Sequence, residues 1–460
     1  MPSPIITDVA IIGAGTAGLT AFSELRRQGL SAVLIDRGPL GTTCARVGCM
    51  PSKAALHAGH QWANLRALLQ DATLPAGAIS AADLWRQARA TRDLLAGNAV
   101  RLTREVAGEQ LIMGTARFTG PHTLDVDGRA VEARAFIVAT GSQPIVPQAL
   151  SSLGERLLTT DSLFDLDHLP ASLGMLGLGA IGLEMGVALS RLGVRVVAGD
   201  MKALPAGITD PEIGARAIER FGHELTMWLG QPMETAAGQS AVTVRSGDAT
   251  AQVDAVLAAL GRRATVADLD LQQAGVALDA RGQPVLDPQT LRGGSSGVFF
   301  AGDASALRPL MHEAADEGLI AARNAAQSID GRAVVIPPRR APMAIVYSDP
   351  DIAAVGQGYD TLNPGQTVIG TAQGAADGRS RIMGAEDNLV RLYVDRASGR
   401  LLGASLIATR GEHLAHLLAW SVQRGDTVES LLAMPYYHPS IEEMVQSALK
   451  DAGRQLRGRR

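Results

Sequence analysis

The sequence is poor in the side chains that build metal sites and aromatic surfaces. It holds two cysteines, and its nine histidines show no spacing typical of metal ligands. His57 and His60 lie three residues apart, but no thiols accompany them other than Cys44 and Cys49. Aromatic residues make up only 3% of the chain. We therefore expect no metal ion, and a core packed mainly from aliphatic side chains.

Charge of one sign and long hydrophobic runs are scarce as well. The net charge of −4 gives no electrostatic footprint for nucleic acid or an acidic membrane surface. The most apolar stretch, residues 173–189, contains five glycines and Glu184, which favours a buried strand, a turn and a helix over a membrane span. The first residues show no basic region followed by an Ala-x-Ala site, so we expect no secretory signal and a cytoplasmic enzyme.

What the chain does have is length, glycine and aliphatic residues. Its 460 residues exceed what one hydrophobic core usually spans, so two or three domains are expected. A hydrophobic content of 46% with 51 glycines is typical of α/β proteins, in which many tight turns join strands to helices.

A glycine-rich fingerprint follows the first predicted strand. Residues 9–12 are typical of a buried strand and lead into Gly13, Gly15 and Gly18, after which a helix is predicted as far as residue 28. The first glycine permits a tight turn, the second lets backbone amides approach a pyrophosphate, and the third lets helix and strand pack closely. The next predicted strand ends in Asp36, whose carboxylate can hold ribose hydroxyls.

The fingerprint occurs a second time. Gly177, Gly179 and Gly182 follow a predicted strand that ends at residue 176, and the strand predicted over residues 195–199 ends in Asp200. From first glycine to acid the distance is 23 residues in both copies, 36 minus 13 and 200 minus 177. The repetition predicts two dinucleotide sites.

The two cysteines, Cys44 and Cys49, lie five positions apart, shortly after the first fingerprint. Two thiols beside a cofactor can cycle between dithiol and disulfide. The alternative is that they are two small buried hydrophobic residues. With two dinucleotides, the pair predicts a relay in which a nicotinamide nucleotide, FAD and the cysteines exchange electrons with a substrate.

An ordered set of motifs resembles those of a known family. The motifs are residues 44–53, Gly114-Thr115-Ala116, residues 139–142, residues 177–184, Gly261-Arg262-Arg263, Ala301-Gly302-Asp303 and residues 438–443. Over nearly its whole length the sequence resembles the FAD-dependent pyridine nucleotide-disulfide oxidoreductases, and it is most similar to dihydrolipoamide dehydrogenases.

The resemblance implies an α/β fold with two Rossmann-like dinucleotide-binding domains and an α+β C-terminal dimerisation domain. The expected FAD domain comprises residues 1–146 and 266–336, the NAD domain residues 147–265, and the interface domain residues 337–460. The prolines at 337–338 mark the expected boundary between the FAD domain and the interface domain. The implied assembly is a homodimer whose subunits share the active site.

The resemblance also assigns FAD to the first fingerprint and NAD to the second. The residues implied in FAD binding are Gly13, Gly15, Gly18, Asp36, Thr43, Lys53, Gly114, Thr140, Gly141, Ser142, Asp303, Met311 and His312. Those implied in NAD binding are Gly177, Gly179, Ile181, Gly182, Glu184, Asp200 and Gly261. For His312 a buried, hydrogen-bonded structural role is the alternative. Asp200 favours NAD because its carboxylate would repel a 2′-phosphate, whereas nearby Lys202 leaves NADP open.

The resemblance gives the cysteines separate roles. It implies that Cys49 lies against the flavin and that Cys44 exchanges with the substrate. The helix expected after Cys49 supports this, because a helix N-terminus lowers a thiol pKa. Lys53 and Glu184 are implied to pair beside the flavin ring, an ordinary surface pair being the alternative.

The C-terminal motif supplies the implied acid–base pair. His438 and Glu443 resemble the family's dyad, in which the histidine takes a proton from the incoming dithiol and the carboxylate fixes its tautomer. The family's dimer places this dyad over the disulfide of the partner subunit.

Three departures from the usual dihydrolipoamide dehydrogenase pattern fall near the substrate. Arg46 replaces an asparagine between the cysteines, and Thr42 stands where a second glycine is usual. Tyr436 and Tyr437 precede His438 where a smaller residue is common; they could narrow the dithiol entrance or pack in the interface.

These features allow three functional hypotheses. The first is an NAD-linked dihydrolipoamide dehydrogenase that acts on a lipoyl carrier or a small dithiol. The second is an NAD(P)H-dependent reductase of another disulfide, a metal ion or a small electron acceptor. The third is a non-catalytic flavoprotein, against which the retention of Cys44, Cys49, His438 and Glu443 argues.

Overall fold

The computed structural model describes residues 3–69 and 79–458. The chain divides into two compact units. Unit 1 consists of Met1–Pro51, Arg89–Ile145 and Gly261–Pro338, and unit 2 of Ser52–Ala88, Val146–Leu260 and Arg339–Arg460. Among the described residues, no helix has both the length and the apolar composition that crossing a bilayer requires.

Unit 1 is built on a seven-stranded sheet. The order β3-β2-β1-β6 is parallel, β17 also pairs with β6 in parallel, and β5 and β4 continue from β6 as an antiparallel meander. The strands are β1 (Ile5–Ile12), β2 (Ala32–Asp36), β3 (Leu111–Met113), β4 (Ala116–Gly120), β5 (Thr123–Val126), β6 (Arg129–Val138) and β17 (Val298–Phe300).

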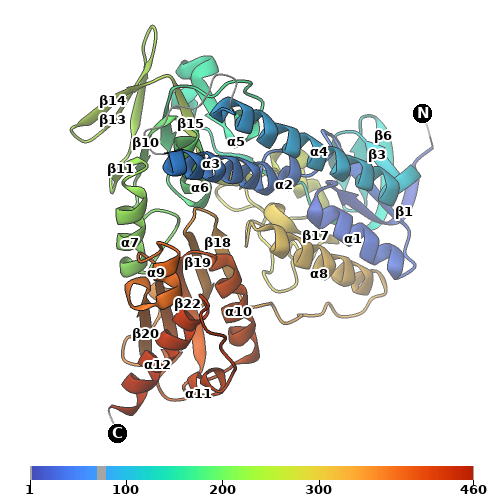
Figure 1. The fold of residues 1–460 in the computed structure, drawn as a ribbon. Helices are drawn as coiled ribbons and strands as arrows, with labels where there is room; N and C mark the ends of the chain where they lie inside the picture. The colour runs from blue at the N-terminus through green and yellow to red at the C-terminus, as the bar shows by residue number, and fades with distance from the viewer. Residues whose placement is uncertain (1–2, 70–78, 459–460) are drawn as a thin grey trace. The chain divides into compact units, whose positions relative to one another are not determined.

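Side chains along the strands of unit 1 point alternately to the two faces of the sheet and pack into two separate hydrophobic cores. In β1, Val9 and Ile11 join the core formed with α1 (Thr16–Arg27) and α8 (Met311–Ile329), whereas Ala10 and Ile12 join the core on the other face. Helices α1 and α8 lie side by side (Figure 1). The remaining elements are α2 (Thr43–Arg46), the start of α3 (Cys49–Leu69), the end of α4 (Ala81–Ala107), and the paired β7 (Ser142–Pro144) and β16 (Arg262–Ala264).

Unit 2 contains a second parallel sheet, of order β11-β10-β9-β15-β8. Its strands are β8 (Leu157–Thr159), β9 (Ser172–Leu176), β10 (Arg195–Asp200), β11 (Thr226–Leu229) and β15 (Ala255–Ala258). Three helices accompany it, α5 (Thr160–Leu163), α6 (Ala180–Arg191) and α7 (Pro211–Phe221). A small antiparallel sheet is made by β12 (Glu234–Ala237), β13 (Val242–Ser246) and β14 (Ala249–Val253).

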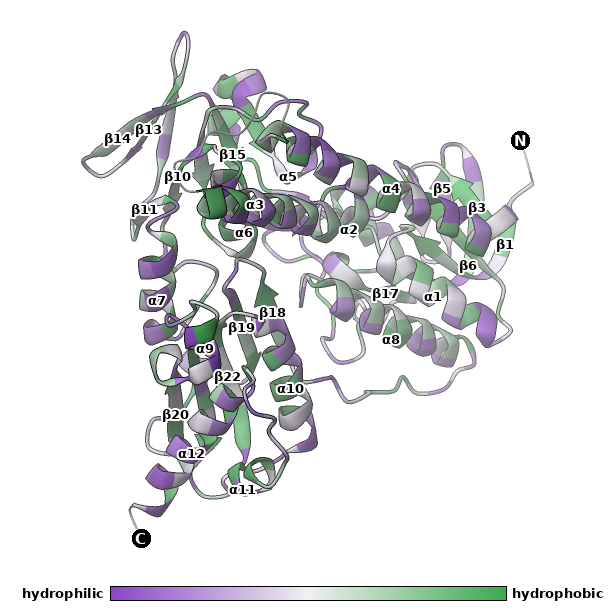
Figure 2. Ribbon diagram, viewed as in Figure 1, coloured by the Kyte–Doolittle hydropathy of each residue, from purple (hydrophilic) through white to green (hydrophobic). Residues whose placement is uncertain are grey.

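The C-terminal part of unit 2 is an antiparallel sheet of order β18-β19-β22-β21-β20. The strands are β18 (Met343–Val346), β19 (Asp351–Gly356), β20 (Thr367–Gln373), β21 (Leu389–Asp395) and β22 (Leu401–Ala408). The helices are α9 (Gly378–Ile382), α10 (Gly411–Arg424), α11 (Val428–Leu432) and α12 (Glu443–Arg457). Helices α7 and α12 carry hydrophilic and hydrophobic residues side by side along their length, as amphipathic helices do (Figure 2).

Helix α3 is fixed within unit 2 by close contact with α6. A Cβ on Gly59 would lie 2.7 Å from the carbonyl oxygen of Ala188, so the two backbones meet where glycine permits it. The hydrophobic core that contains residues of α3 and α6 also includes Val346 and Ile352 of the C-terminal sheet. The predicted α/β fold class is therefore confirmed: there are two sheets with parallel strands and helices, the first extended by two antiparallel strands, and an α+β C-terminal part.

Candidate functional site

The first glycine fingerprint forms a tight loop between β1 and α1. Gly13 has φ of +109°, and a Cβ there would lie 2.2 Å from the carbonyl oxygen of Ala139. A Cβ on Gly18 would lie 1.9 Å from the carbonyl oxygen of Gly13. Asp36 at the end of β2 accepts a hydrogen bond of 2.7 Å from the backbone N–H of Ala14. The loop is thus closed by the protein's own packing, and its geometry excludes side chains at two positions.

Two features in and beside this loop are not explained by packing within the protein. At Gly15, φ is −78°, and apart from its chain neighbours no heavy atom of the described residues lies within 4 Å of the position that a Cβ would take, so the chain itself would accept a side chain there. The Thr140 hydroxyl oxygen is buried and has no hydrogen-bond partner among the described residues. Open space above a backbone and a buried hydroxyl in need of a partner both fit a bound dinucleotide.

A polar cluster in the same unit surrounds the predicted flavin residues Ser142 and Asp303. The Ser142 hydroxyl donates to Asp303 Oδ2 at 2.5 Å and accepts from Arg262 Nε at 2.9 Å. Glu317 of α8, fully buried, accepts hydrogen bonds from the Gly302 backbone N–H at 3.0 Å and from the Ser305 hydroxyl at 2.8 Å. Glu317 therefore fixes the turn that carries Asp303.

Sequence reasoning missed Glu317. The signal was an acidic residue on the apolar face of a predicted helix, because Glu317 lies three residues after Ala314 and three before Ile320, both of which are buried. A buried carboxylate needs hydrogen-bond donors, and here the turn supplies them.

The other residues assigned to FAD are scattered over several elements. Gly114 follows β3, and its backbone N–H donates to the Asp36 carbonyl oxygen at 2.9 Å. Thr43 begins α2 and is exposed. Met311 and His312 begin α8 and are also exposed in this chain, so the chain itself does not bury His312. Gly141, φ +68°, accepts from the Thr265 backbone N–H at 3.0 Å.

The second fingerprint repeats the geometry of the first in unit 2. Gly177 has φ of +92°, and a Cβ on Gly182 would lie 2.1 Å from the Gly177 carbonyl oxygen. Asp200 accepts from the Leu178 backbone N–H at 2.7 Å. Gly179 again has no described heavy atom within 4 Å of its Cβ position. These residues fit a second dinucleotide by the same argument.

Asp36 and Asp200 each accept hydrogen bonds from backbone N–H groups at both carboxylate oxygens. Asp36 Oδ1 accepts from Gly38 N at 2.6 Å, and Asp200 Oδ1 accepts from Lys202 N at 2.8 Å. An ionised carboxylate has about four lone-pair sites, so capacity for ribose hydroxyls remains. Ile181 is 36% exposed beside the second loop. Of the residues assigned to NAD, Gly261 belongs to unit 1 and the others to unit 2.

The two cysteines belong to unit 1 and lie in consecutive helices, Cys44 in α2 and Cys49 as the first residue of α3. Both are thiols in the structure, and the side chains are hydrogen-bonded to each other. This bond, with burial, raises the pKa of the Cys44 thiol above its ordinary value, and it outweighs the backbone N–H groups of Cys49 and Met50, which lower it. The backbone N–H groups at the helix N-terminus lower the pKa, as expected. The net pKa of Cys44 is nevertheless raised, because the hydrogen bond between the two thiols and burial favour the protonated form.

Two of the sequence departures shape the backbone around the cysteines. Thr42 has φ of +55° and ψ of 146°, a conformation that suits glycine, and its hydroxyl accepts from the Ala45 backbone N–H at 3.1 Å. Arg46 donates from Nη1 to the Pro39 carbonyl oxygen at 3.3 Å. The position at which a glycine is usual thus retains a glycine-like backbone despite carrying threonine.

The predicted pair of Lys53 and Glu184 is brought together in unit 2. Lys53 Nζ lies 2.8 and 2.9 Å from the two carboxylate oxygens of Glu184. The side chains are 34% and 7% exposed, so this is not an ordinary surface pair. Lys53 belongs to α3 and Glu184 to α6, the two helices that meet at Gly59.

The predicted dyad is also formed in unit 2. His438 Nδ1 lies 3.1 and 3.2 Å from the carboxylate oxygens of Glu443, the first residue of α12. The Ser440 backbone N–H donates to Glu443 at 3.0 Å, and this bond together with His438 holds the pKa of Glu443 below its usual value. An ionised Glu443 favours the proton on Nδ1 and leaves Nε2 as the base. The His438 side chain is 80% exposed, open to a reaction partner. The adjoining Tyr437 is exposed as well, whereas Tyr436 packs against the core of the C-terminal sheet.

Known families and structures match most of the chain. Residues 7–325 match the family model described as pyridine nucleotide-disulphide oxidoreductase, and residues 343–449 match that of its dimerisation domain.

Among curated proteins, the chain is 28% identical to dihydrolipoyl dehydrogenase 3 of Haloarcula marismortui, with 97% of this chain and 96% of that protein covered. It is 29% identical to a dihydrolipoyl dehydrogenase of Thermus scotoductus, with 96% of each covered. Similar solved structures include a Cu(II) complex of the HOCl-induced flavoprotein disulfide reductase RclA of Escherichia coli, with a TM-score of 0.84, 22% identity, and 96% of this chain and 99% of that one covered. LpdA of Mycobacterium tuberculosis gives a TM-score of 0.83 at 24% identity, with 98% of this chain and 99% of that one covered.

Proposed function

The chain belongs to the pyridine nucleotide-disulphide oxidoreductase family, and we propose that within this family it is an NAD-linked dihydrolipoamide dehydrogenase. The coarser function, a flavin-dependent disulfide oxidoreductase with a dimerisation domain, follows from the family. The observation that carries the proposal is that the chain has both pairs needed for disulfide exchange: Cys44 contacts Cys49, and His438 contacts Glu443.

The proposed roles follow from the contacts of each group. A dithiol substrate attacks the Cys44–Cys49 disulfide, and two exchange steps leave the substrate oxidised to a disulfide and the cysteines reduced to thiols. His438 accepts the substrate thiol proton at Nε2, while Glu443 holds Nδ1. FAD, when bound, would supply two-electron transfer between the cysteines and the nicotinamide nucleotide.

We assign the cofactors to the two fingerprints. Gly13, Gly15, Gly18, Thr140 and Asp303 would hold FAD. The second loop, from Gly177 to Gly182, would hold NAD, with Asp200 selecting against a 2′-phosphate. Accordingly, we divide the chain into an FAD domain of residues 1–146 and 266–336, an NAD domain of residues 147–265 and an interface domain of residues 337–460. We also propose that the chain forms a homodimer in which the dyad of one subunit acts on the disulfide of the other.

The experiment is lipoamide-dependent NADH oxidation by the purified, FAD-loaded protein. Cys44→Ser should abolish turnover with the flavin retained, and His438→Ala should lower it by about 10²- to 10⁴-fold. His413→Ala is the matched control, because His413 is also exposed and lies 3.5 Å from a glutamate, Glu412. Wild-type protein whose flavin is reduced by NADH but which does not turn over lipoamide would refute the substrate assignment.

One observation favours a second candidate, a reductase of an anionic disulfide. Arg46 brings a guanidinium two residues from Cys44, at a place where the family usually has asparagine. If this candidate holds, wild type should prefer a disulfide that carries carboxylates over lipoamide, and Arg46→Asn should remove the preference.

A further inference from the structure

The Lys53–Glu184 pair has a third partner from a distant segment of the chain. Tyr347 follows β18, and its backbone N–H donates to Glu184 Oε1 at 3.1 Å. Lys53 Nζ also lies 4.7 Å from the centre of the Tyr347 ring. The ammonium is therefore held between a carboxylate and the negative face of an aromatic ring, an attraction of about 0.5–2 kcal/mol according to exposure.

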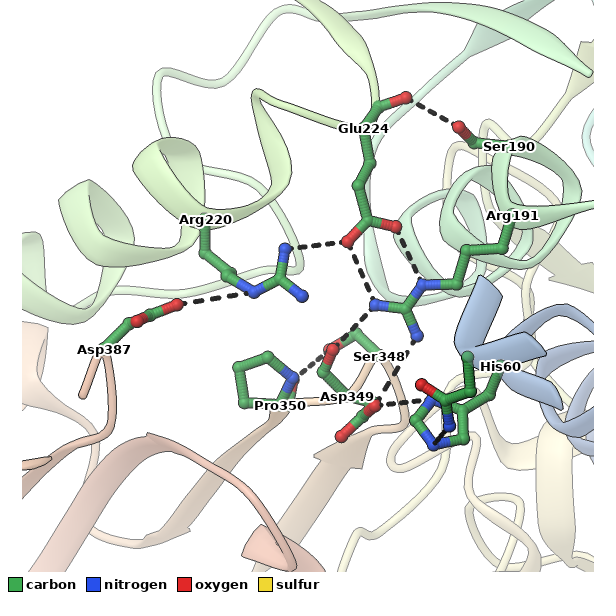
Figure 3. A network of polar contacts seen from close by, with 10 residues as sticks. His60, Ser190, Arg191, Arg220, Glu224, Ser348, Asp349, Pro350 and Asp387 are labelled. Carbon is green, nitrogen blue, oxygen red and sulfur yellow. Dashed lines mark hydrogen bonds and ion pairs between the residues drawn. The ribbon is translucent and has the colours of Figure 1, made fainter. Parts of the chain in front are cut away.

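The same segment holds α3 at a second point. Asp349 lies 2.7 Å from His60 Nδ1, and the Asp349 carbonyl oxygen accepts from Arg191 Nη2 at 2.8 Å (Figure 3). Lys53 and His60 are seven residues apart, which is two turns of α3 and places them on one side of it. Residues 347–349 thus contact α3 at both ends of these two turns.

The second contact is part of a larger charged network. Arg191 pairs with Glu224 at 2.8 Å, and Arg220 joins Glu224 at 2.8 Å, so the anchor extends from α3 to α6 and α7 (Figure 3). The hydrogen bond from His60 lowers the pKa of Asp349, which keeps this carboxylate charged at neutral pH. The segment that presents Tyr347 is therefore fixed in place.

Helix α3 also links Lys53 to the redox cysteines. Cys49 is the first residue of α3 and Lys53 follows four residues later, one turn along the same face. The family resemblance implies that the flavin lies against Cys49, and on that premise the position of the Lys53 charge on this face matters for the flavin.

We propose that Tyr347 is a positioning residue, which fixes the ammonium of Lys53 against Glu184 and thereby sets how strongly that charge favours the reduced flavin. This inference rests on the proposed FAD site but not on the identity of the disulfide substrate. We assign the role to the ring, because the ring is the part of the side chain that lies against Lys53 Nζ.

The test compares Tyr347→Leu with Tyr347→Phe in the FAD-loaded enzyme. The equilibrium constant for two-electron reduction of the flavin is measured by titration with dithionite against a reference dye. Tyr347→Leu should shift this constant towards oxidised flavin by roughly two- to fivefold, because the ammonium loses its π partner. Tyr347→Phe keeps the ring and should match wild type. Tyr359→Leu, which removes another half-buried tyrosine of unit 2, should also match wild type.

A double-mutant cycle separates positioning from a general packing effect. If Tyr347 acts through Lys53, Tyr347→Leu should have no further effect in a Lys53→Met background. An unchanged constant in Tyr347→Leu, an equal shift in Tyr347→Phe, or additive effects with Lys53→Met would each overturn the inference. Urea unfolding of the apoproteins verifies that each variant folds.

The outcome is independent of the substrate assignment. A shifted constant in Tyr347→Leu stands even if wild type does not turn over lipoamide. Normal lipoamide turnover with an unshifted constant would remove the role of Tyr347 and leave the proposed function intact.

Discussion

The two glycine fingerprints have nearly the same geometry but different surroundings. In each, the first glycine has a positive φ, the third lies against the carbonyl oxygen of the first, and an aspartate accepts a bond of 2.7 Å from the second residue of the loop. Around the first loop, Ala17 is buried and its carbonyl oxygen would lie 2.5 Å from a Cβ on Gly318 of α8. At the corresponding place in the second loop, Ile181 is 36% exposed.

A second difference lies one turn further into each helix. Seven residues after the first glycine, α1 has Thr20, whereas α6 has Glu184, which is buried and paired with Lys53. The local sequence therefore determines the geometry of each glycine loop, and the neighbouring elements determine its surroundings. This comparison can be tested position by position.

The largest effects are expected at the third glycines. Gly18→Ala and Gly182→Ala each place a Cβ about 2 Å from a backbone oxygen, so each should lower the free energy of unfolding by about 3 kcal/mol or more. Gly18→Ala should also lose FAD, whereas Gly182→Ala should retain FAD and lose reduction by NADH. Thermal unfolding and flavin absorbance measure both effects.

Two glycines in open space serve as controls for this pair. Gly97 in α4 and Gly378 in α9 have no described heavy atom within 4 Å of a Cβ and no positive φ. Alanine at Gly97 should be neutral or stabilise by about 0.5–1 kcal/mol, because it lies within a helix. If the Gly97 and Gly18 variants lose equal stability, close packing is not the reason for the third glycine.

The second glycines should separate ligand binding from stability. Gly15→Ala and Gly179→Ala meet open space, so unfolding without cofactor should change by less than about 0.5 kcal/mol. Cofactor affinity should fall by about tenfold or more, since a methyl group would occupy the approach to the pyrophosphate. Isothermal titration of the apoprotein with FAD, and of the FAD-loaded protein with NADH, measures this. Unchanged affinities would mean that neither loop approaches a phosphate closely.

The aspartates should show an intermediate effect on cofactor choice. Asp200→Asn keeps an acceptor for Leu178 N–H but removes the charge, so the preference for NADH over NADPH should narrow by about tenfold. Asp36→Asn should weaken FAD and leave the nucleotide preference unchanged. Catalytic efficiencies with the two nucleotides test the pair, and a wild type that prefers NADPH would contradict the assignment to NAD.

The smallest effect is expected at Ile181. Because its side chain is partly exposed, Ile181→Ala should change stability by no more than about 0.5 kcal/mol. If the side chain covers the bound nucleotide, NADH affinity should fall a few-fold, by about 0.5–1 kcal/mol. Leu260→Ala is a matched control, since Leu260 is exposed to a similar extent in the same unit. Equal effects of the two variants would remove Ile181 from the site.

Local patterns in the sequence predicted most of the fold and much of the site. The predicted strand that ends in Asp36 and the helix predicted between Gly18 and residue 28 agree with β2 and α1 to within a few residues, because buried strands, glycine turns and helices have short-range signals. The family resemblance implied the pairs His438–Glu443 and Lys53–Glu184, and the structure brings each together. Glu317 and Tyr347 were missed, since each acts through contacts with backbone or side chains far away in the sequence.

The thiol chemistry shows the same limit. The start of α3 at Cys49 was predictable, but the raised pKa of Cys44 was not, because it depends on the distance between two side chains and on burial. Likewise, the sequence marked Thr42 as unusual, but only the structure shows that its backbone adopts φ of +55°.

The sequence by itself determined the two glycine loops and the spacing of Cys44 and Cys49, because these depend on residues within about one turn or one strand of each other. The order of the motifs along the whole chain indicated the family. The tertiary structure decided which carboxylate meets which cation, which glycines are needed by the protein rather than by a ligand, and that Tyr347 lies over Lys53. Those contacts join segments separated by 131 and 163 residues, as between Lys53 and Glu184 and between Glu184 and Tyr347, and only packing of the whole unit can bring them together.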